Sequence, residues 1–291
     1  MAEIVAAVAC SHAPGLATRP QLDAAGTKQR FYDGLKEAGR RLAATRPTAL
    51  LIVSNEHIQN FFFNNWPTFC LAFPEEMEGP IETWMPMPRY HLRGYPEFGQ
   101  YLLEAALAAH FDLSSSQELE PDHAVMLPLH HMQYGTDLPM AILLQNCVQP
   151  PLPTLARCVE LGRFLAKAIA AWPRPDRFAL VGVGGISHWI GVKNMGAVNE
   201  AWDRWFIDEI CQGHVDALAR ITPEELNRDA GNGGEEIRNW LTVAAAVGDH
   251  PGEPISYEAV TDWVVGCGCV FWDLTKAPRE AASPGTAATR Q

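Results

Sequence analysis

The chain has 291 residues, of which 47% are hydrophobic and 19% charged, and its formal net charge is -12. This length and composition fit an ordinary globular protein with one large domain or two small ones. The excess of acidic residues argues against nucleic acid or an anionic membrane as the main partner, because either would favour a basic face. The sequence has no run of about 18 apolar residues that would cross a bilayer, and it begins without the features of a signal peptide. We therefore expect a cytoplasmic protein.

Strand-like and helix-like segments alternate along most of the chain. In chain order, we predict a strand at 4–10, a helix at 27–45, a strand at 49–54, a helix at 97–109, a strand at 140–145, a helix at 155–171, a strand at 178–183, a helix at 199–211, a short helix from Pro223, a helix at 235–247 and a strand at 263–272. The strands are continuous apolar runs, which is typical of strands buried on both faces. The helix at 27–45 is amphipathic.

This alternation predicts a single α/β domain over residues 1–275, with a central, largely buried sheet flanked by helices on both faces. Residues 59–95 are rich in aromatics and prolines, and we expect an irregular, packed wall or lid there. Residues 276–291 have the composition of a disordered tail. The seven scattered cysteines include no Cys-x-x-Cys pair, so we expect buried thiols rather than disulfides.

Five polar residues lie at the ends of these predicted elements. His12, His57 and His188 follow strands, His123 follows a polar stretch, and Glu236 lies in the first turn of a helix. Ligands of α/β sheets bind at the carboxyl ends of the strands, so we expect these side chains to surround one cleft. Two histidines with one carboxylate match the facial triad that binds non-haem Fe(II), and zinc held by the same residue types is the nearest rival.

Each of the five has a plainer interpretation when it is taken alone. His12 and His57 are then surface or capping residues at strand ends, and Glu236 is a glutamate that favours the helix dipole. His188 is harder to explain in this way, because Gly184 and Gly185 before it indicate a close approach of the backbone to another group.

The motifs around these residues resemble those of class III extradiol ring-cleavage dioxygenases along residues 1–270. The matching segments are Ser11-His12-Ala13-Pro14, Asn55-Glu56-His57, Pro67-Thr68-Phe69, Asp122-His123 with Pro128-Leu129, Gly184-Gly185-Ile186-Ser187-His188, and Glu236 four residues before Trp240. The nearest resemblance is to the protocatechuate 4,5-dioxygenase β subunit, supported by Arg93-Gly94-Tyr95-Pro96-Glu97 and Phe206-Ile207-Asp208. The 2,3-dihydroxyphenylpropionate dioxygenases are similar to a lesser degree.

The resemblance implies that His12, His57 and Glu236 bind Fe(2+), and that His188 is the general base and acid with His123 opposite it. It implies that the substrates are O2 and a vicinal aromatic diol. Among such diols it favours a carboxylated catechol such as protocatechuate or gallate. Soluble enzymes of this kind are usually homo-oligomers, so we expect one here. The related two-subunit enzymes also have a small α subunit, so a small partner subunit is a second expectation.

Several alternatives stay open at this stage. One alternative concerns the substrate, which would be a hydroxylated pyridone or an uncarboxylated catechol. The others concern the function, because a protein with the same fold could be a zinc hydrolase or a non-enzymatic binding protein. The chain departs from the family pattern at Ala124, where glycine is usual, and at Trp189, where glutamine is frequent. Either residue can alter the pocket for the ring.

Overall fold

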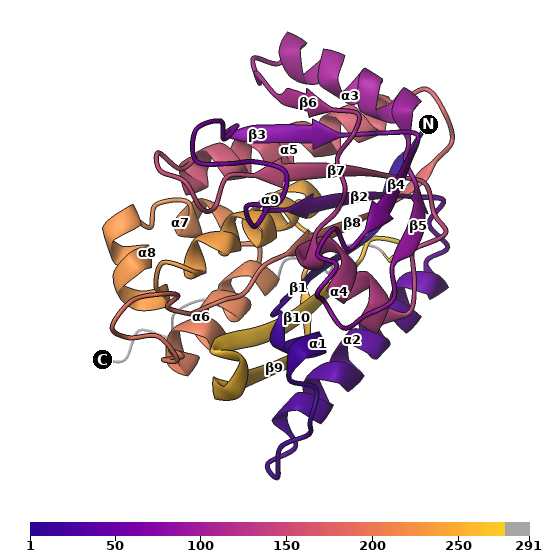
Figure 1. Cartoon of the computed structure of the whole chain (residues 1–291). Helices are drawn as coiled ribbons and strands as arrows, with labels where there is room; N and C mark the ends of the chain where they lie inside the picture. The colour runs from indigo at the N-terminus through magenta and orange to yellow at the C-terminus, as the bar shows by residue number, and fades with distance from the viewer. Residues whose placement is uncertain (277–291) are drawn as a thin grey trace, which may run out of the picture.

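Eight strands form one mixed sheet in the order β6-β3-β7-β2-β8-β1-β10-β9, in a computed structural model that describes residues 1–276 (Figure 1). The strands of this sheet are β1 (Glu3–Cys10), β2 (Ala49–Ser54), β3 (Phe69–Ala72), β6 (Ser114–Ser116), β7 (Met140–Gln145), β8 (Arg177–Val183), β9 (Glu253–Val260) and β10 (Val265–Asp273). The central strands β7, β2, β8 and β1 are parallel to one another, and β10 pairs with β1 in antiparallel orientation. The expected α/β fold is confirmed.

The central strands are apolar on both faces because both faces are covered. Along β1, Ala7 and Ala9 belong to one hydrophobic core, whereas Ala6, Val8 and Cys10 belong to the other. This alternation follows from the period of two residues in a strand. A continuous apolar run therefore supplies two cores at once, one on each side of the sheet.

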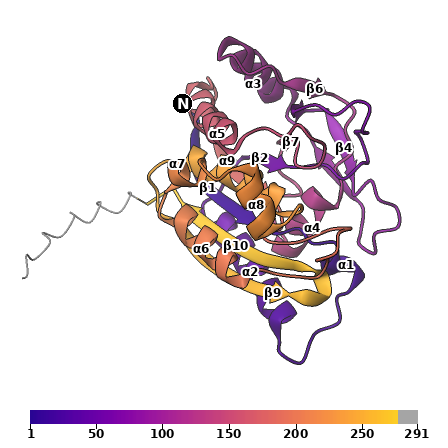
Figure 2. The ribbon, with the colours of Figure 1, turned by 90° about the vertical axis from the view of Figure 1, so that its left-hand side faces the viewer.

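Helices cover the two faces in separate layers (Figures 1 and 2). The longer ones are α2 (Thr27–Ala44), α3 (Pro96–Ala108), α4 (His123–Met132), α5 (Leu155–Ala171), α6 (Glu200–Cys211), α8 (Pro223–Ala230) and α9 (Ile237–Val247). Helices α2 and α4 pack into one core, and α3, α5, α6 and α9 pack into the other. Short helices α1 (Gly15–Thr18) and α7 (Val215–Leu218) complete the set, together with one-turn helices η1 (Gly234–Glu236) and η2 (Thr261–Trp263).

Several elements differ from the sequence-based expectation. Residues 59–95 are not wholly irregular, because they contain β3 and the hairpin of β4 (Glu76–Gly79) with β5 (Tyr90–Arg93). Helix α4, strands β6 and β9, and the short helices α1 and α7 were not expected. The last helix begins at Ile237, so Glu236 ends the one-turn helix η1 instead of lying inside α9. The expected disordered tail falls almost wholly on residues 277–291, which lie outside the described residues.

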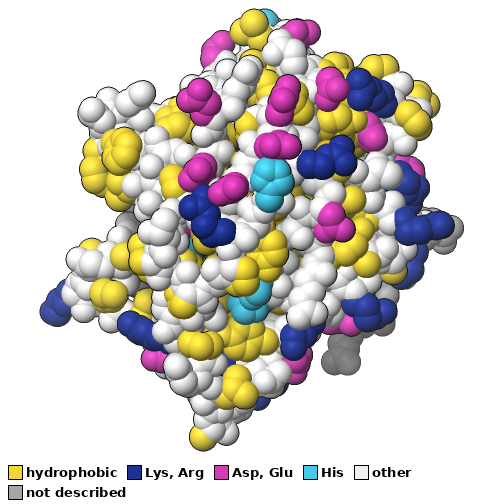
Figure 3. All heavy atoms as spheres, turned by 45° about the vertical axis from the view of Figure 1, so that its right-hand side comes forward, with side chains coloured by type: hydrophobic (Ala, Val, Ile, Leu, Met, Phe, Trp, Pro, Cys, Tyr) yellow, Lys and Arg dark blue, Asp and Glu magenta, His cyan; other side chains and the backbone are white. Residues whose placement is uncertain are grey.

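The surface and the cysteines agree with an ordinary globular domain. On the face in Figure 3, acidic, basic and apolar side chains are interspersed. Within residues 1–276, none of the helices has both the length and the apolar character needed to cross a membrane. The seven cysteines are all buried and unpaired, as the sequence predicts.

Candidate active site

The five predicted side chains lie together at the carboxyl end of the central strands. His12 follows β1, His57 follows β2 and His188 follows β8, while His123 is the first residue of α4 and Glu236 ends η1. All five line one cavity. The parallel arrangement of β1, β8 and β2 explains this convergence, because their carboxyl ends meet at one edge of the sheet (Figure 1).

The carboxylate of Glu236 lies at the centre of the group. Its Oε1 atom is 3.4 Å from Nε2 of His12 and 3.2 Å from Nε2 of His57. Its Oε2 atom accepts a hydrogen bond of 2.6 Å from the backbone N–H of Gly185 and lies 3.9 Å from Nε2 of His188. One buried carboxylate therefore faces three imidazoles.

The two glycines before His188 allow this approach. A Cβ atom on Gly184 would come within 2.7 Å of the carbonyl oxygen of Glu236, and one on Gly185 within 2.7 Å of the His188 ring. Distances this short are sterically forbidden for a real side chain. The glycine pair thus brings β8 against Glu236, which is the close approach that the sequence predicts.

His57 is oriented by a carboxylate on its far side. The Oδ2 atom of Asp122 is 2.9 Å from Nδ1 of His57 and accepts the His57 backbone N–H at 3.0 Å. An ionised carboxylate only accepts, and the pKa of Asp122 lies at about 2, because the charge and hydrogen bond of His57 outweigh the effect of burial. Nδ1 therefore carries a proton and Nε2 is directed at Glu236. Carboxylate–histidine pairs of this kind typically lie behind metal ligands.

A series of hydrogen bonds between buried amide side chains leads to Glu236 and supports its carboxylate. Nδ2 of Asn55 donates to Oε1 of Glu236 at 3.1 Å, and Nδ2 of Asn239 donates to Oδ1 of Asn55 at 3.0 Å. Gln145 in turn donates to Oδ1 of Asn239 at 3.0 Å, and also to the hydroxyl of Thr242. These groups are buried and satisfied, so they hold the carboxylate in one orientation.

The charges of the group are tightly coupled. Burial alone would lower the pKa of His57, but the Asp122 and Glu236 carboxylates outweigh it and hold this pKa well above its ordinary value. Burial alone would raise the pKa of Glu236, yet His12, His57 and His188 hold it well below its ordinary value. Burial, together with the neighbouring His57, lowers the pKa of His123. The pocket therefore stabilises a carboxylate and accommodates positive charge beside it.

The donor set fits a metal ion. Nε2 of His12 and Nε2 of His57 face the same carboxylate oxygen of Glu236, and Nε2 of His123 is buried without a hydrogen-bond partner, which is costly unless a ligand satisfies it. Nitrogen atoms of His12, His57 and His123 also lie within 4.8 Å of one another. By position alone, either Glu236 or His123 can be the third donor beside His12 and His57, so this candidate metal centre has two candidate third ligands.

His188 has its proton placed by the backbone. Its Nδ1 atom is 3.0 Å from the carbonyl oxygen of Ile186. A carbonyl only accepts, so Nδ1 carries a proton and Nε2 of the neutral ring holds the lone pair. Asp203 fixes the same loop, because its Oδ1 accepts the Ser187 backbone N–H at 2.9 Å. His188 therefore presents a proton acceptor to the cavity.

The cavity measures about 280 Å³ and is mainly apolar beyond the histidines and Glu236. Its apolar lining consists of Ala13, Pro14, Ile190, Met195, Trp263, Val264 and Val265. Ala124 and Trp189, where the chain departs from the family pattern, are not among the lining residues. A flat apolar ring with polar groups at one edge suits such a space.

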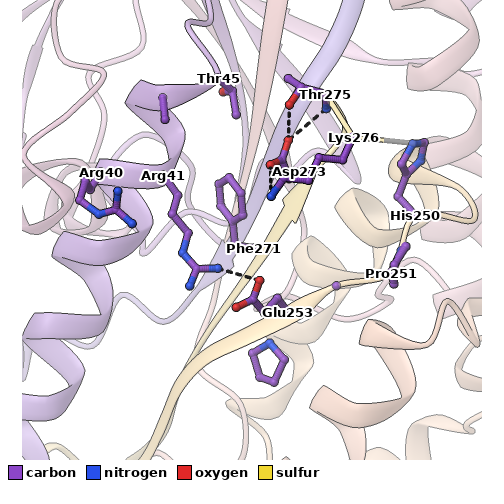
Figure 4. A pocket seen from close by; sticks show the side chains of 13 residues that line it. Arg40, Arg41, Thr45, His250, Pro251, Glu253, Phe271, Asp273, Thr275 and Lys276 are labelled. Carbon is purple, nitrogen blue, oxygen red and sulfur yellow. Dashed lines mark hydrogen bonds and ion pairs between the residues drawn. The ribbon is translucent and has the colours of Figure 1, made fainter. Parts of the chain in front are cut away.

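A larger hollow of about 720 Å³ lies at the other end of β1 and β10 and holds none of these residues. Figure 4 shows Arg41 paired with Glu253 and Lys276 paired with Asp273, at 2.8 Å and 2.9 Å. The third cation, Arg40, pairs with Glu37 on its own helix. The smaller cavity is therefore the candidate active site, because it is lined by the four histidines and Glu236.

The sequence assigned no role to the residues that support the five site positions. Asn55 and Asp122 stood inside quoted motifs without a role, and their positions beside predicted ligands were the available signal. Glu82 had no signal, because it lies in the loop after β4 and meets His123 only in the folded chain.

Comparison with known proteins gives consistent results. A family model described as the catalytic LigB subunit of aromatic ring-opening dioxygenase matches residues 6–271. A protein of Paraburkholderia phymatum named 2,3-dihydroxyphenylpropionate/2,3-dihydroxicinnamic acid 1,2-dioxygenase is 25% identical, over 80% of this chain and 86% of its own length. A protein of the same name from Photorhabdus laumondii is 23% identical, over 90% and 95%.

A crystal structure of an uncharacterized protein from Escherichia coli K12 has the same fold. Its TM-score is 0.57 at 18% identity, with 92% of this chain and 99% of that chain covered. The family match extends over nearly all described residues and includes all five site positions. The chain therefore belongs to the family of catalytic LigB subunits of aromatic ring-opening dioxygenases, and it is an extradiol-type ring-cleavage enzyme.

Proposed function

We propose that the protein is an Fe(2+)-dependent extradiol dioxygenase that cleaves a carboxylated catechol next to its two hydroxyl groups and inserts both atoms of O2. In this proposal His12, His57 and Glu236 hold the iron, and His188 is the general base and acid with His123 opposite it. The observation that carries the proposal is the Glu236 carboxylate, which lies within 3.4 Å of both imidazoles at the edge of an apolar cavity.

The iron would supply a Lewis-acidic, redox-active centre with open positions for a diol and O2. The chain's own residues would do the rest. Nε2 of His188 would take a proton from a diol hydroxyl, because Ile186 keeps the other ring nitrogen protonated. Trp263 and Val265 would pack on the ring and exclude water.

A substrate panel under controlled oxygen tests the proposal. Protein loaded anaerobically with Fe(2+) is mixed with protocatechuate, gallate, 2,3-dihydroxyphenylpropionate, catechol and a dihydroxypyridine, in buffer containing 18O2. We expect oxygen uptake and a ring-opened product that carries both labelled atoms. Zinc-loaded and metal-free protein serve as controls and should be inactive. Failure of fully iron-loaded protein to consume oxygen with any vicinal diol would overturn the proposal.

Arg19 is the residue we propose for the substrate's carboxylate. Among the described residues that line the cavity it is the one lysine or arginine, and its side chain is 58% exposed. Its Nη1 atom donates to the carbonyl oxygen of Asp262 at 2.5 Å, which holds the guanidinium beside Trp263 in η2. The Asp262 carboxylate also lines this side, 3.8 Å from Nη1 of Arg19, but it is shared with Lys28 and does not fully neutralise the guanidinium. Since the inner wall is apolar, an anionic substituent is accommodated best at the side where Arg19 lies.

Arg19→Gln is expected to raise KM for a carboxylated catechol by about 10-fold or more, because a hydrogen bond to a charged group is lost. KM for uncarboxylated catechol should be unchanged, and Arg40→Gln, which removes an exposed guanidinium at the far hollow, should affect neither substrate. Equal effects of Arg19→Gln on both substrates would show that Arg19 acts through the fold and not through the carboxylate.

The homo-oligomer and the small partner subunit also remain proposals. Their support is a set of exposed apolar side chains within residues 58–84, namely Ile58, Phe62, Phe63 and Trp84, since exposed apolar side chains are frequent at interfaces when they lie together. Light scattering of the purified chain tests self-association, and a monomer with full activity would contradict both.

A further inference from the structure

Glu82 is a buried carboxylate in the loop between β4 and β5, within the segment that the sequence suggested was a wall. Its side chain is 1% exposed. The loop is fixed to the start of α4, because the backbone N–H of Ile81 donates to the carbonyl oxygen of Pro121 at 2.9 Å. A Cβ atom on Gly79 would come within 2.7 Å of Pro121, so the two segments are in close contact. This contact delivers a charged side chain to the active site.

Both oxygens of Glu82 are engaged by His123. Oε2 accepts the His123 backbone N–H at 2.9 Å, and Oε1 lies 2.6 Å from Nδ1 of the ring. Asp122 likewise contacts both the backbone N–H of His57, at 3.0 Å, and Nδ1 of its ring, at 2.9 Å, but through the single oxygen Oδ2. Each carboxylate therefore ties the backbone and the ring of one imidazole together.

These contacts fix both the orientation and the tautomer of the His123 ring. Because the carboxylate of Glu82 accepts, Nδ1 of His123 donates and Nε2 is left with the lone pair. That Nε2 atom is buried without a partner, and His123 lines the cavity. The side chain of Glu82 accepts hydrogen bonds from no other group within residues 1–276. The burial of its charge is therefore explained by His123 alone, since a buried carboxylate is costly without such a partner.

A second cation site is the competing interpretation, because ligand atoms of Glu82, Asp122 and His123 lie within 4.8 Å of one another. The hydrogen bonds argue against it. Oδ1 of Asp122 accepts the Ala124 backbone N–H, Oδ2 is used by His57, and both oxygens of Glu82 are used by His123. The carboxylates are already satisfied by protein donors.

We propose that Glu82 is a positioning residue that holds His123 in the Nδ1–H tautomer, with Nε2 directed at the substrate. The inference rests on the proposed function of the same cavity. It assigns different roles to the two carboxylate–imidazole pairs. The pair of Asp122 and His57 serves metal binding, and the pair of Glu82 and His123 serves turnover.

The test uses Glu82→Gln and Glu82→Ala with two comparison variants. Glu75→Gln removes an exposed carboxylate one residue before β4, and Asp122→Asn removes the partner of His57. For the Glu82 variants we expect wild-type iron content, KM within about threefold and kcat lower by about 10- to 100-fold, the range seen when an outer-shell partner is lost. Asp122→Asn should instead lower iron content, and Glu75→Gln should change nothing.

A readout on metal-free protein keeps this test independent of ring cleavage. Imidazole 15N NMR should show His123 as the Nδ1–H tautomer in the wild type and as a mixture, or as the Nε2–H tautomer, in Glu82→Ala. Unchanged NMR signals and an unchanged kcat in that variant would overturn the inference. Loss of iron from Glu82→Gln would also overturn it, by placing this pair in metal binding. If the wild type cleaves no diol but the tautomer shifts, the positioning contact stands and the proposed function fails.

Discussion

Glu236→Gln is expected to abolish stoichiometric iron binding and, with it, ring cleavage. The change keeps the shape of the side chain but removes the charge that faces His12 at 3.4 Å and His57 at 3.2 Å. An amide also places a donor where one carboxylate oxygen accepts the Gly185 N–H or the Asn55 amide. Iron content after anaerobic loading and desalting measures the effect directly. We expect a loss of affinity of at least 100-fold, because an anionic ligand is replaced by a neutral one.

The matched control is Glu235→Gln in the neighbouring position. Glu235 forms a buried ion pair with Arg238 and does not line the cavity. Its loss should lower the thermal midpoint, since removing one partner of a buried pair leaves the other charge uncompensated, but it should leave iron content near wild type. If Glu236→Gln retains stoichiometric iron, the assignment of Glu236 is wrong. The cluster of His12, His57 and His123 then becomes the ligand set, and His123→Ala should release the metal.

The site residues could be predicted where their position follows from a local pattern. Apolar runs at β1, β2 and β8 identify strands buried on both faces, and the ends of parallel strands converge regardless of the details of packing. His12, His57 and His188 are placed by that rule alone. The glycine pair before His188 also has a local meaning, because only glycine allows β8 to approach Glu236 so closely.

The elements that escaped prediction have weak or contrary local signals. Helix α4 contains Pro128, which is unfavourable inside a helix, and it is stabilised by the Asp122 cap and by packing against α2. Strands β4 and β5 have four residues each, too few for a clear alternation. Glu82 meets His123 across 41 residues, and contacts of this range are set by the tertiary fold and not by sequence periodicity.

His188→Ala is expected to keep iron and lose turnover. Nε2 of His188 lies 3.9 Å from Oε2 of Glu236, farther than the 3.4 Å and 3.2 Å that separate His12 and His57 from Oε1. The carbonyl of Ile186 holds the proton on Nδ1 and leaves Nε2 free to accept one. Loss of a positioned acid–base group typically costs about 10²- to 10⁴-fold in rate. We expect the decrease in kcat, with KM changed little, in oxygen-uptake measurements on protein whose iron content has been determined.

Rescue by a small base distinguishes a lost proton acceptor from a damaged fold. Without the imidazole the ring's space opens between Gly185 and Gly233, both of which contact it closely in the wild type, so added imidazole should restore part of kcat. His214→Ala removes an exposed imidazole paired with Glu209 and should leave kcat unaltered. If His188→Ala loses its iron, His188 belongs to the metal site. If it turns over at the wild-type rate, the proton acceptor lies elsewhere, and His123, whose Nε2 is also directed inward without a partner, is the residue that the geometry offers in its place.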